Sequence, residues 1–213
     1  MKKQKNKNTP PLGGDHIQCT GPNIYSSNKL KYCWVRVPKC GGSTITHYLQ
    51  KHARPTHHEW ASSHSGWQDY FKFAFVRNPW DRLYSCYNNK VLMGGVNCSK
   101  YLQAFAKTKP SFRDWIKEIS REDNILKDRH FSPFHTLLIN KDFKSMDFMG
   151  KIENFKEDFN FVCDKIGISR KKLPHKNKTK HKHYTEYYDE EIKQIVAEKY
   201  AKDIEYFGYK FGE

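Results

Sequence analysis

Apolar positions along the chain predict a strand, then a helix, then a second strand. The run LKYCWVRV, residues 30–37, is rich in aromatic and β-branched side chains and stops at a proline, as a buried strand does. From Ser43 onward apolar residues recur at helical spacing, and Ser43 or Thr44 can cap this helix. The segment DYFKFAFVR, residues 69–77, again has the pattern of a buried strand.

A second helix is predicted directly after residues 69–77. Asn78 suits the N-cap, Pro79 suits the first helical position, and Asp81 places a negative charge in the first turn. A strand, a loop and a helix therefore follow one another twice. This order is typical of an α/β fold with a parallel sheet.

The later part of the chain is predicted to add helices and one more strand. Residues 91–110, which include MGGVNCSK and KTKP, are interpreted as an irregular excursion. A third strand is expected to end near Glu153. Amphipathic patterns predict three more helices, over residues 111–120, residues 155–167 with a glycine stop, and residues 189–208 with an aspartate cap and a glycine stop.

The composition indicates a folded protein with a polar surface. The chain has 213 residues, a mean hydropathy of −0.90 and an aromatic content of 15%. No apolar run approaches the roughly 18 residues that a membrane span needs. The basic start of the chain has no apolar segment behind it, so it is unlike a signal peptide. We expect residues 1–28 to form a mobile basic tail and residues 29–213 to form the folded domain.

The net charge and the cysteine spacing limit the possible partners and metal or redox sites, but they do not select one function. The net charge of +15 suits nucleic acid, a membrane surface, or acidic small molecules and glycans as partners. None of the six cysteines forms a C-x-x-C pair. No cluster of His, Cys and Asp has metal-ligand spacing, so we expect no metal site.

The turn between the first strand and helix has the composition of an anion site. Gly41 and Gly42 allow the backbone to approach an anion closely, at a helix N-terminus whose dipole favours negative charge. Lys39 adds a positive charge, and Ser43 and Thr44 add hydroxyl donors. The alternative is an ordinary tight turn. The turn is not a Walker A loop, because the lysine precedes both glycines.

Two segments together resemble a known family. VPKCGGSTI, residues 37–45, resembles the phosphosulfate-binding loop of sulfotransferases that use 3′-phosphoadenylyl sulfate, PAPS. FAFVRNPWDRLYSCY, residues 73–87, resembles their 3′-phosphate motif, in which an Arg is followed eight positions later by a Ser, here Arg77 and Ser85. Segments such as MDFMGKIENF are similar to the carbohydrate-sulfotransferase-like branch, sulfotransferase family 2. The likeness runs from about Leu30 to Phe211.

The resemblance implies the fold, the cofactor and its contacts. The fold would be a single P-loop-like three-layer α/β domain, with a central parallel sheet flanked by helices. PAPS would be the cofactor and adenosine 3′,5′-bisphosphate the product. Arg77 and Ser85 would hold the 3′-phosphate, although a salt bridge to Asp81 and a packing role are the structural alternatives for these two residues. The phosphosulfate would be bound by Pro38, Lys39, Cys40, Gly41, Gly42, Ser43 and Thr44.

The reaction would be sulfuryl transfer to a hydroxyl, with Lys39 stabilising the leaving oxygen. The acceptor would be an acidic or neutral glycan, without nucleic acid as a partner and with no membrane span in this chain. The location would be the cytoplasm if the chain is complete, or the Golgi lumen if a membrane anchor was removed. Rival interpretations are a P-loop-type small-molecule kinase, which lacks its lysine and magnesium motifs here, and a basic nucleic-acid-binding protein, which lacks a recognisable module.

The acceptor hydroxyl needs a general base, and a histidine has a suitable pKa. The segment THHEWASSHSGW lies between the two nucleotide motifs, where relatives in this branch place a His. We favour His58, then His57 and His64. Glu59 and His130 are the alternatives. Glu153, at the predicted third strand's end, is expected either near the cofactor or in a helix-capping or salt-bridge role.

Overall fold

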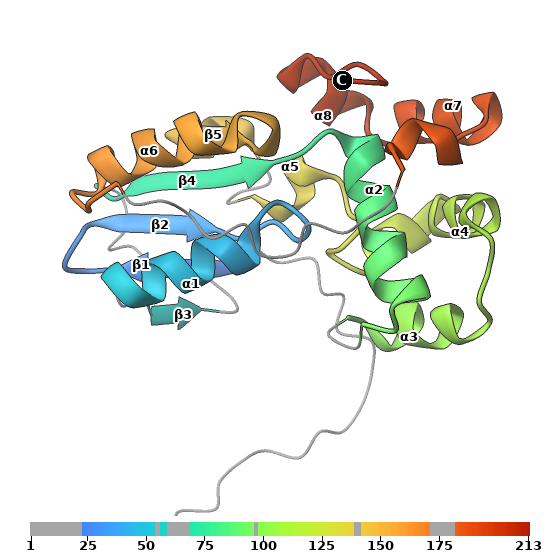
Figure 1. Ribbon diagram of the computed structural model, residues 1–213, viewed down its shortest axis with the longest axis horizontal. Helices are drawn as coiled ribbons and strands as arrows, with labels where there is room; N and C mark the ends of the chain where they lie inside the picture. The colour runs from blue at the N-terminus through green and yellow to red at the C-terminus, as the bar shows by residue number, and fades with distance from the viewer. Residues whose placement is uncertain (1–22, 54–55, 59–68, 96–97, 139–141, 171–181) are drawn as a thin grey trace, which may run out of the picture.

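A computed structural model of the chain describes residues 23–53, 56–58, 69–95, 98–138, 142–170 and 182–213. One five-stranded sheet organises the molecule, with the strand order β3-β1-β2-β4-β5 (Figure 1). The strands are β1 (Ile24–Ser27), β2 (Tyr32–Val35), β3 (Thr56–His58), β4 (Phe71–Val76) and β5 (Phe148–Lys151).

The centre of the sheet is parallel, as expected for two successive strand–helix units. β2 pairs with β4 and β4 pairs with β5, both in parallel register. The carboxyl ends of these three strands therefore lie at one edge, where ligands of open α/β sheets bind. The predicted α/β class with a parallel centre flanked by helices is confirmed.

The two outer strands were not predicted. β1 runs antiparallel to β2, and β3 runs antiparallel to β1, so β3 points in the same direction as β2. The predicted start of the domain at residue 29 is wrong, because β1 already pairs with β2 from Ile24 onward. The side chain of Ile24 is fully buried, so this strand belongs to the core.

The core is built largely from aromatic side chains on the strands. Phe73 and Phe75 of β4 are almost completely buried. The ring of Phe75 contacts that of Phe159 in helix α6 (Phe155–Lys165) with centroids 6.1 Å apart. Tyr48 of helix α1 (Gly42–His52) meets the same Phe159 edge-on at 5.2 Å. α1 and α6 therefore pack side by side on one face of the sheet (Figure 1).

A second group of helices gathers beyond the carboxyl ends of the strands (Figure 1). Trp80 links α2 to α7, since its Nε1–H donates to the carbonyl oxygen of Lys193 at 3.1 Å. No helix within the described residues is long and apolar enough to cross a membrane. The α-helices of this group are α2 (Pro79–Tyr87), α3 (Lys100–Lys107), α4 (Phe112–Ile119), α5 (Phe134–Leu137), α7 (Glu190–Lys199) and α8 (Ala201–Phe207).

Short segments of other helical types complete the fold. A π-helical turn, η1, extends α2 directly. The 3₁₀ turns connect the α-helices and strands of the later chain. These short elements are η1 (Asn88–Leu92), η2 (Glu122–Leu126), η4 (Phe143–Ser145), η5 (Ile152–Asn154) and η6 (Tyr184–Tyr187).

Two element predictions need correction. Residues 91–110 contain a regular helix, α3, which Ser99 caps by accepting from the N–H of Leu102 at 3.2 Å. The single helix predicted over residues 189–208 is two helices, α7 and α8, that meet at Tyr200. Tyr200 is buried and its hydroxyl donates to the carbonyl oxygen of Phe131, so an interior contact redirects the chain at this point.

Candidate functional site

The turn from β2 into α1 has an unusual backbone. Lys39 has a φ of 68° and Gly41 a φ of 70°, both in the left-handed region. For a lysine this conformation costs about 1–2 kcal/mol. Such strain concentrates at functional sites.

Gly41 is the N-cap of α1, so the prediction that Ser43 or Thr44 caps this helix is wrong. The carbonyl oxygen of Gly41 accepts from the N–H groups of Thr44 at 3.0 Å and Ile45 at 3.1 Å. No side-chain cap is made at this end. The first N–H groups of a helix lack intrahelical partners, and together with the helix dipole they favour an anion.

A side chain at either glycine of the turn would crowd a neighbouring side chain. A Cβ built on Gly41 would lie 2.8 Å from Cδ1 of Ile152, and one on Gly42 would lie 2.7 Å from Nε of Arg36. Contacts this close do not occur for real Cβ atoms. Gly41 is half-buried, and without a side chain its backbone can approach an anion closely, as a phosphate-binding turn requires.

The remaining residues predicted to contact the phosphosulfate face different ways. Ser43 is exposed at the start of α1. The side chain of Thr44 is buried, and so is that of Cys40, whose thiol donates to the carbonyl oxygen of Pro38 at 3.6 Å. The side chains of Cys40 and Thr44 are therefore turned away from an anion at the surface, whereas the hydroxyl of Ser43 is accessible to one.

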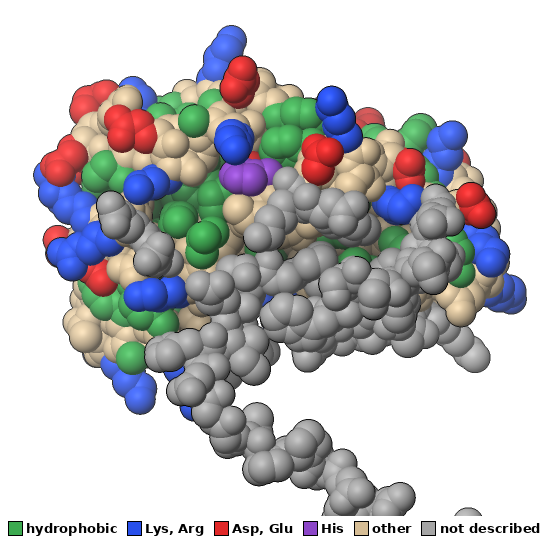
Figure 2. Space-filling model, turned by 180° about the vertical axis from the view of Figure 1, so that it is seen from behind, with side chains coloured by type: hydrophobic (Ala, Val, Ile, Leu, Met, Phe, Trp, Pro, Cys, Tyr) green, Lys and Arg blue, Asp and Glu red, His purple; other side chains and the backbone are tan. Residues whose placement is uncertain are grey.

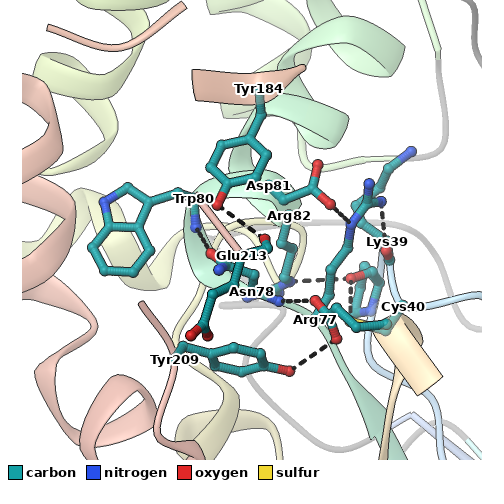
Figure 3. A network of polar contacts seen from close by, with 12 residues as sticks. Lys39, Cys40, Arg77, Asn78, Trp80, Asp81, Arg82, Tyr184, Tyr209 and Glu213 are labelled. Atoms are coloured by element: carbon teal, nitrogen blue, oxygen red, sulfur yellow. Dashed lines mark hydrogen bonds and ion pairs between the residues drawn. The ribbon is translucent and has the colours of Figure 1, made fainter. Parts of the chain in front are cut away.

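Arg77 joins the second strand–helix junction to the first. Its Nε–H donates to Oδ2 of Asp81 at 2.7 Å, and its Nη1 lies 3.4 Å from the carbonyl oxygen of Lys39 (Figure 3). The salt bridge weighed as an alternative is therefore present, and the guanidinium also reaches the glycine turn. Ser85 is four residues beyond Asp81 and lies on the same face of α2, half-buried.

The N-terminus of α2 is already capped by protein groups. Asn78 accepts from the N–H of Trp80 at 3.2 Å, and its own N–H donates to Oε1 of Glu153 at 2.7 Å. The hydroxyl of Tyr209 donates to Oε2 of Glu153 at 3.4 Å. Glu153 thus has the capping role, one of its two predicted alternatives. A phosphate beside α2 would have to be bound by side chains, such as those of Arg77 and Ser85.

Lys39 lies in a positively charged environment. Burial lowers the pKa of its ammonium below the ordinary lysine value, and the charges of Lys90 and Arg77 lower this pKa further. A lysine with a lowered pKa gives up its proton more readily. Lys39 is therefore suited to hydrogen-bond, or protonate, an oxygen that gains negative charge.

Arg82 is a structural centre of the site that sequence reasoning missed. Its side chain is completely buried on α2 and its guanidinium lies 4.7 Å from the ring centroid of Phe134. Nε–H donates to the carbonyl oxygen of Pro38 at 3.1 Å (Figure 3). Nη2–H donates to that of Arg129 at 2.8 Å, and Nη1–H donates to that of Ser132 at 2.7 Å. One side chain thus fixes residues 128–132 against the glycine turn.

Residues 128–132 hold an Asp–His pair. Nδ1 of His130 lies 2.6 Å from Oδ1 of Asp128, and the N–H of Ser99 donates to Oδ2 at 2.5 Å. Asp128 is 1% exposed. Burial raises the pKa of its carboxyl, but the contacts with His130 and Ser99 outweigh this and lower the pKa to about 2. His130, an alternative in the sequence analysis, is therefore tightly positioned.

The histidines favoured from the sequence are only partly described. His57 and His58 close β3, where they pair with Tyr25 and Ile24. Since β3 and β2 run in the same direction, the end of β3 lies at the sheet edge that carries the glycine turn, about 10 Å from β2 by ordinary strand spacing. Their side chains, and all of Glu59 and His64, lie outside the described residues. This choice of base stays a prediction.

Charge on the described part of one face is mixed in sign. On the coloured part of the face in Figure 2, Lys and Arg side chains are interspersed with Asp and Glu. In the described ranges, no group of three or more His, Cys, Asp or Glu side chains could hold a metal ion.

The fold and the two junctions define an α/β protein with two neighbouring candidate anion sites. A family model described as "Sulfotransferase family" matches residues 22–210, and the chain belongs to this family. It is 26% identical over 163 residues to carbohydrate sulfotransferase 14 of Danio rerio. The match covers 66% of this chain and 44% of that relative, so the chain corresponds to less than half of the relative's length. No solved structure matches the chain.

Proposed function

We propose that the chain transfers a sulfuryl group from PAPS to a hydroxyl of a carbohydrate and releases adenosine 3′,5′-bisphosphate. The observation that carries the proposal is the position of Arg77. Its guanidinium contacts both Asp81 of α2 and the carbonyl oxygen of Lys39 in the glycine turn. The two anionic groups of one small nucleotide lie close together, so the protein sites that bind them must be neighbours. The two strand–helix junctions are neighbours, because Arg77 contacts both.

PAPS carries two anionic groups that the two junctions suit separately. The glycine turn, with the α1 N-terminus and the Lys39 ammonium, suits the phosphosulfate. The planar fork of Arg77 suits the 3′-phosphate, with the hydroxyl of Ser85 on the same helix face as a second donor. These contacts remain proposals for this chain.

The proposed reaction is an in-line sulfuryl transfer in which negative charge develops on the leaving oxygen. The acceptor oxygen attacks sulfur in line, a new S–O bond forms, and the bond from sulfur to the bridging phosphate oxygen breaks. The electron pair of the broken bond stays on that oxygen as adenosine 3′,5′-bisphosphate leaves. Lys39 stabilises the developing charge, and a general base takes the proton of the acceptor hydroxyl.

A carbohydrate is proposed as the acceptor from the family and from the name of the relative. A glycan, acidic or neutral, fits a protein of net charge +15.

The test is transfer of label from ³⁵S-PAPS to a panel of neutral and acidic polysaccharides, with ³²P-labelled ATP and Mg²⁺ in parallel. Incorporation of ³⁵S by the wild-type chain, and its loss in Lys39→Ala, supports the proposal. Transfer of ³²P instead would establish a kinase. Failure to transfer ³⁵S to any acceptor, together with failure to bind adenosine 3′,5′-bisphosphate, would overturn the proposed function.

A further inference from the structure

The loop that carries His130 is fixed beside the glycine turn by one buried side chain. The guanidinium of Arg82 donates to the carbonyl oxygens of Pro38 and Arg129, the residues directly before Lys39 and His130. Since one planar guanidinium spans both bonds, the two backbone segments are neighbours across it. The position of His130 relative to Lys39 is therefore set by Arg82 and not by a mobile surface contact.

The orientation of the His130 ring is set by Asp128. Oδ1 of this buried carboxylate accepts from the backbone N–H of His130 at 2.8 Å and lies 2.6 Å from the ring Nδ1. A carboxylate only accepts, so Nδ1 carries the proton and Nε2 carries the lone pair in the neutral ring. The side chain of His130 remains 15% exposed.

The charges around His130 keep its ring neutral. Burial lowers the pKa of the imidazole, contact with Asp128 raises it, and the positive charges of Lys90 and Lys39 lower it again. Lys90 comes from η1 and Lys39 from the glycine turn, so the two charges that act on His130 belong to separate segments. At neutral pH the ring is therefore a proton acceptor.

We propose that His130 is the general base that removes the proton from the acceptor hydroxyl, with Asp128 as its positioning residue. This inference rests on the proposed function. As the acceptor oxygen bonds to sulfur, its proton passes to Nε2 of His130, and the leaving oxygen of the nucleotide is met by Lys39. The imidazolium then releases the proton to water, which restores the neutral ring.

The proposal differs from the choice made on sequence alone, which favoured His58. In this chain His130 has a buried carboxylate partner and lies on a loop that Arg82 fixes against the glycine turn. His135 provides a matched control, because its Nδ1 also lies near a buried carboxylate, 3.1 Å from Oδ1 of Asp203. That pair joins α5 to α8, where the His135 ring packs on Phe143.

The experiment compares His130→Gln, His135→Gln and His58→Ala, using ³⁵S-PAPS and the polysaccharide that the wild type modifies fastest. We expect His130→Gln to lose about 10²–10⁴-fold in kcat while its affinity for adenosine 3′,5′-bisphosphate changes less than threefold. His135→Gln should stay within threefold of wild type in both. If His58→Ala loses the activity and His130→Gln keeps it, the proposal is overturned while the enzyme class survives.

A wild-type measurement keeps the proposal testable if His130→Gln fails to fold. kcat/KM should fall on the acid side of a pKa below the ordinary histidine value of about 6.5. In Asp128→Asn this acid limb should move to lower pH, because the carboxylate that raises the pKa of His130 is gone; a purely structural role would leave the limb in place. An acid limb at or above 6.5 in the wild type would contradict the assignment. If the wild type neither transfers ³⁵S nor binds adenosine 3′,5′-bisphosphate, the proposed function fails first.

Discussion

The side chain of Arg77 links the two strand–helix junctions, since it contacts Asp81 in one and the carbonyl oxygen of Lys39 in the other. The Arg77–Asp81 ion pair is about four-fifths buried on each side, so it is more than a solvated surface contact. Arg77 is thereby held with its Nη1 toward the glycine turn. A donor that is already oriented loses less entropy when it binds an anion.

Arg77→Ala tests the 3′-phosphate contact. Loss of a charge-assisted hydrogen bond should weaken binding of adenosine 3′,5′-bisphosphate by about 1.5–3 kcal/mol. The control is Arg113→Ala, which removes an exposed arginine paired with Asp189 and Glu191 on the helical side and should leave affinity unchanged. Titration calorimetry on folded protein measures both. Equal affinity in Arg77→Ala and wild type would remove Arg77 from the nucleotide site.

Lys39→Ala tests the role of the ammonium in the transition state. We expect kcat to fall more than nucleotide affinity, because the leaving oxygen gains charge only during transfer. The lowered pKa of Lys39 adds a pH signature: activity should decline with rising pH at a value below the ordinary lysine pKa of 10.5, as the ammonium loses its proton.

Lys39→Arg separates charge from proton donation. It keeps the positive charge but does not lose its proton in the accessible range, so it should retain most of the nucleotide affinity and lack the alkaline decline. A normal kcat with only a raised KM in Lys39→Ala would make Lys39 a uniform anchor instead.

At the scale of elements, the glycine turn depends on a left-handed backbone conformation and on the absence of a side chain at Gly41. Gly41 combines a left-handed φ with a Cβ position 2.8 Å from Ile152. Gly208 has a similar φ of 66° at the end of α8, and a Cβ there would meet nothing within 4 Å. The two glycines therefore share a left-handed backbone conformation and differ in local space.

Gly41→Ala and Gly208→Ala form a matched pair. Both should destabilise the fold by about 1 kcal/mol through backbone strain, measured by denaturant unfolding. Only Gly41→Ala should in addition lose affinity for adenosine 3′,5′-bisphosphate, by at least tenfold, because the methyl group would crowd Ile152 and disturb the turn that binds the phosphosulfate end. Equal affinities in the two variants would mean that the turn binds no phosphate.

The sequence predicted the elements whose ends are marked locally. Pro38 ends the run that contains β2, and the pair Asn78–Pro79 marks the start of α2. β1 and β3 were missed because segments as short as IYSS and THH become strands only through long-range pairing. The break at Tyr200 was missed for a related reason, since the contact that bends the chain involves Phe131, far away in sequence.

The sequence also predicted part of the candidate site. The motifs identified the two junctions, because glycine, lysine and arginine lie within a few residues of each strand end. Arg82 was missed because its three carbonyl partners come from segments distant along the chain, and nothing in the local pattern distinguishes it from a surface arginine. The environment of His130 was missed for the same reason: Asp128 is nearby in sequence, but its burial and the approach of Lys90 and Lys39 are tertiary.

At the scale of the whole molecule, Asp128 makes the free energy of unfolding depend on pH. Its folded pKa of about 2 lies below the ordinary value of 3.8, so its contribution to stability is fully present above pH 4 and is lost as pH falls toward 2. This contribution of Asp128 to the free energy of unfolding is about 2 kcal/mol, since each pKa unit corresponds to about 1.4 kcal/mol.

Asp128→Asn should show this linkage. The difference in unfolding free energy between wild type and Asp128→Asn should shrink by about 2 kcal/mol as pH falls from 5 to 2. Denaturant unfolding at several pH values measures it, with Asp189→Asn, an exposed helix cap, as the comparison. A difference that stays constant over this range would show that Asp128 is not held as a carboxylate in the fold.

Calorimetric titration of the wild-type chain with adenosine 3′,5′-bisphosphate and, separately, with adenosine 5′-monophosphate isolates the 3′-phosphate that defines the proposed cofactor. The two junctions predict that the bisphosphate binds at least tenfold more tightly, a difference of about 1.4 kcal/mol or more, and that Arg77→Ala removes most of this difference. Equal affinities for the two nucleotides in the wild type, or no binding of either, would contradict the assignment of these junctions to PAPS.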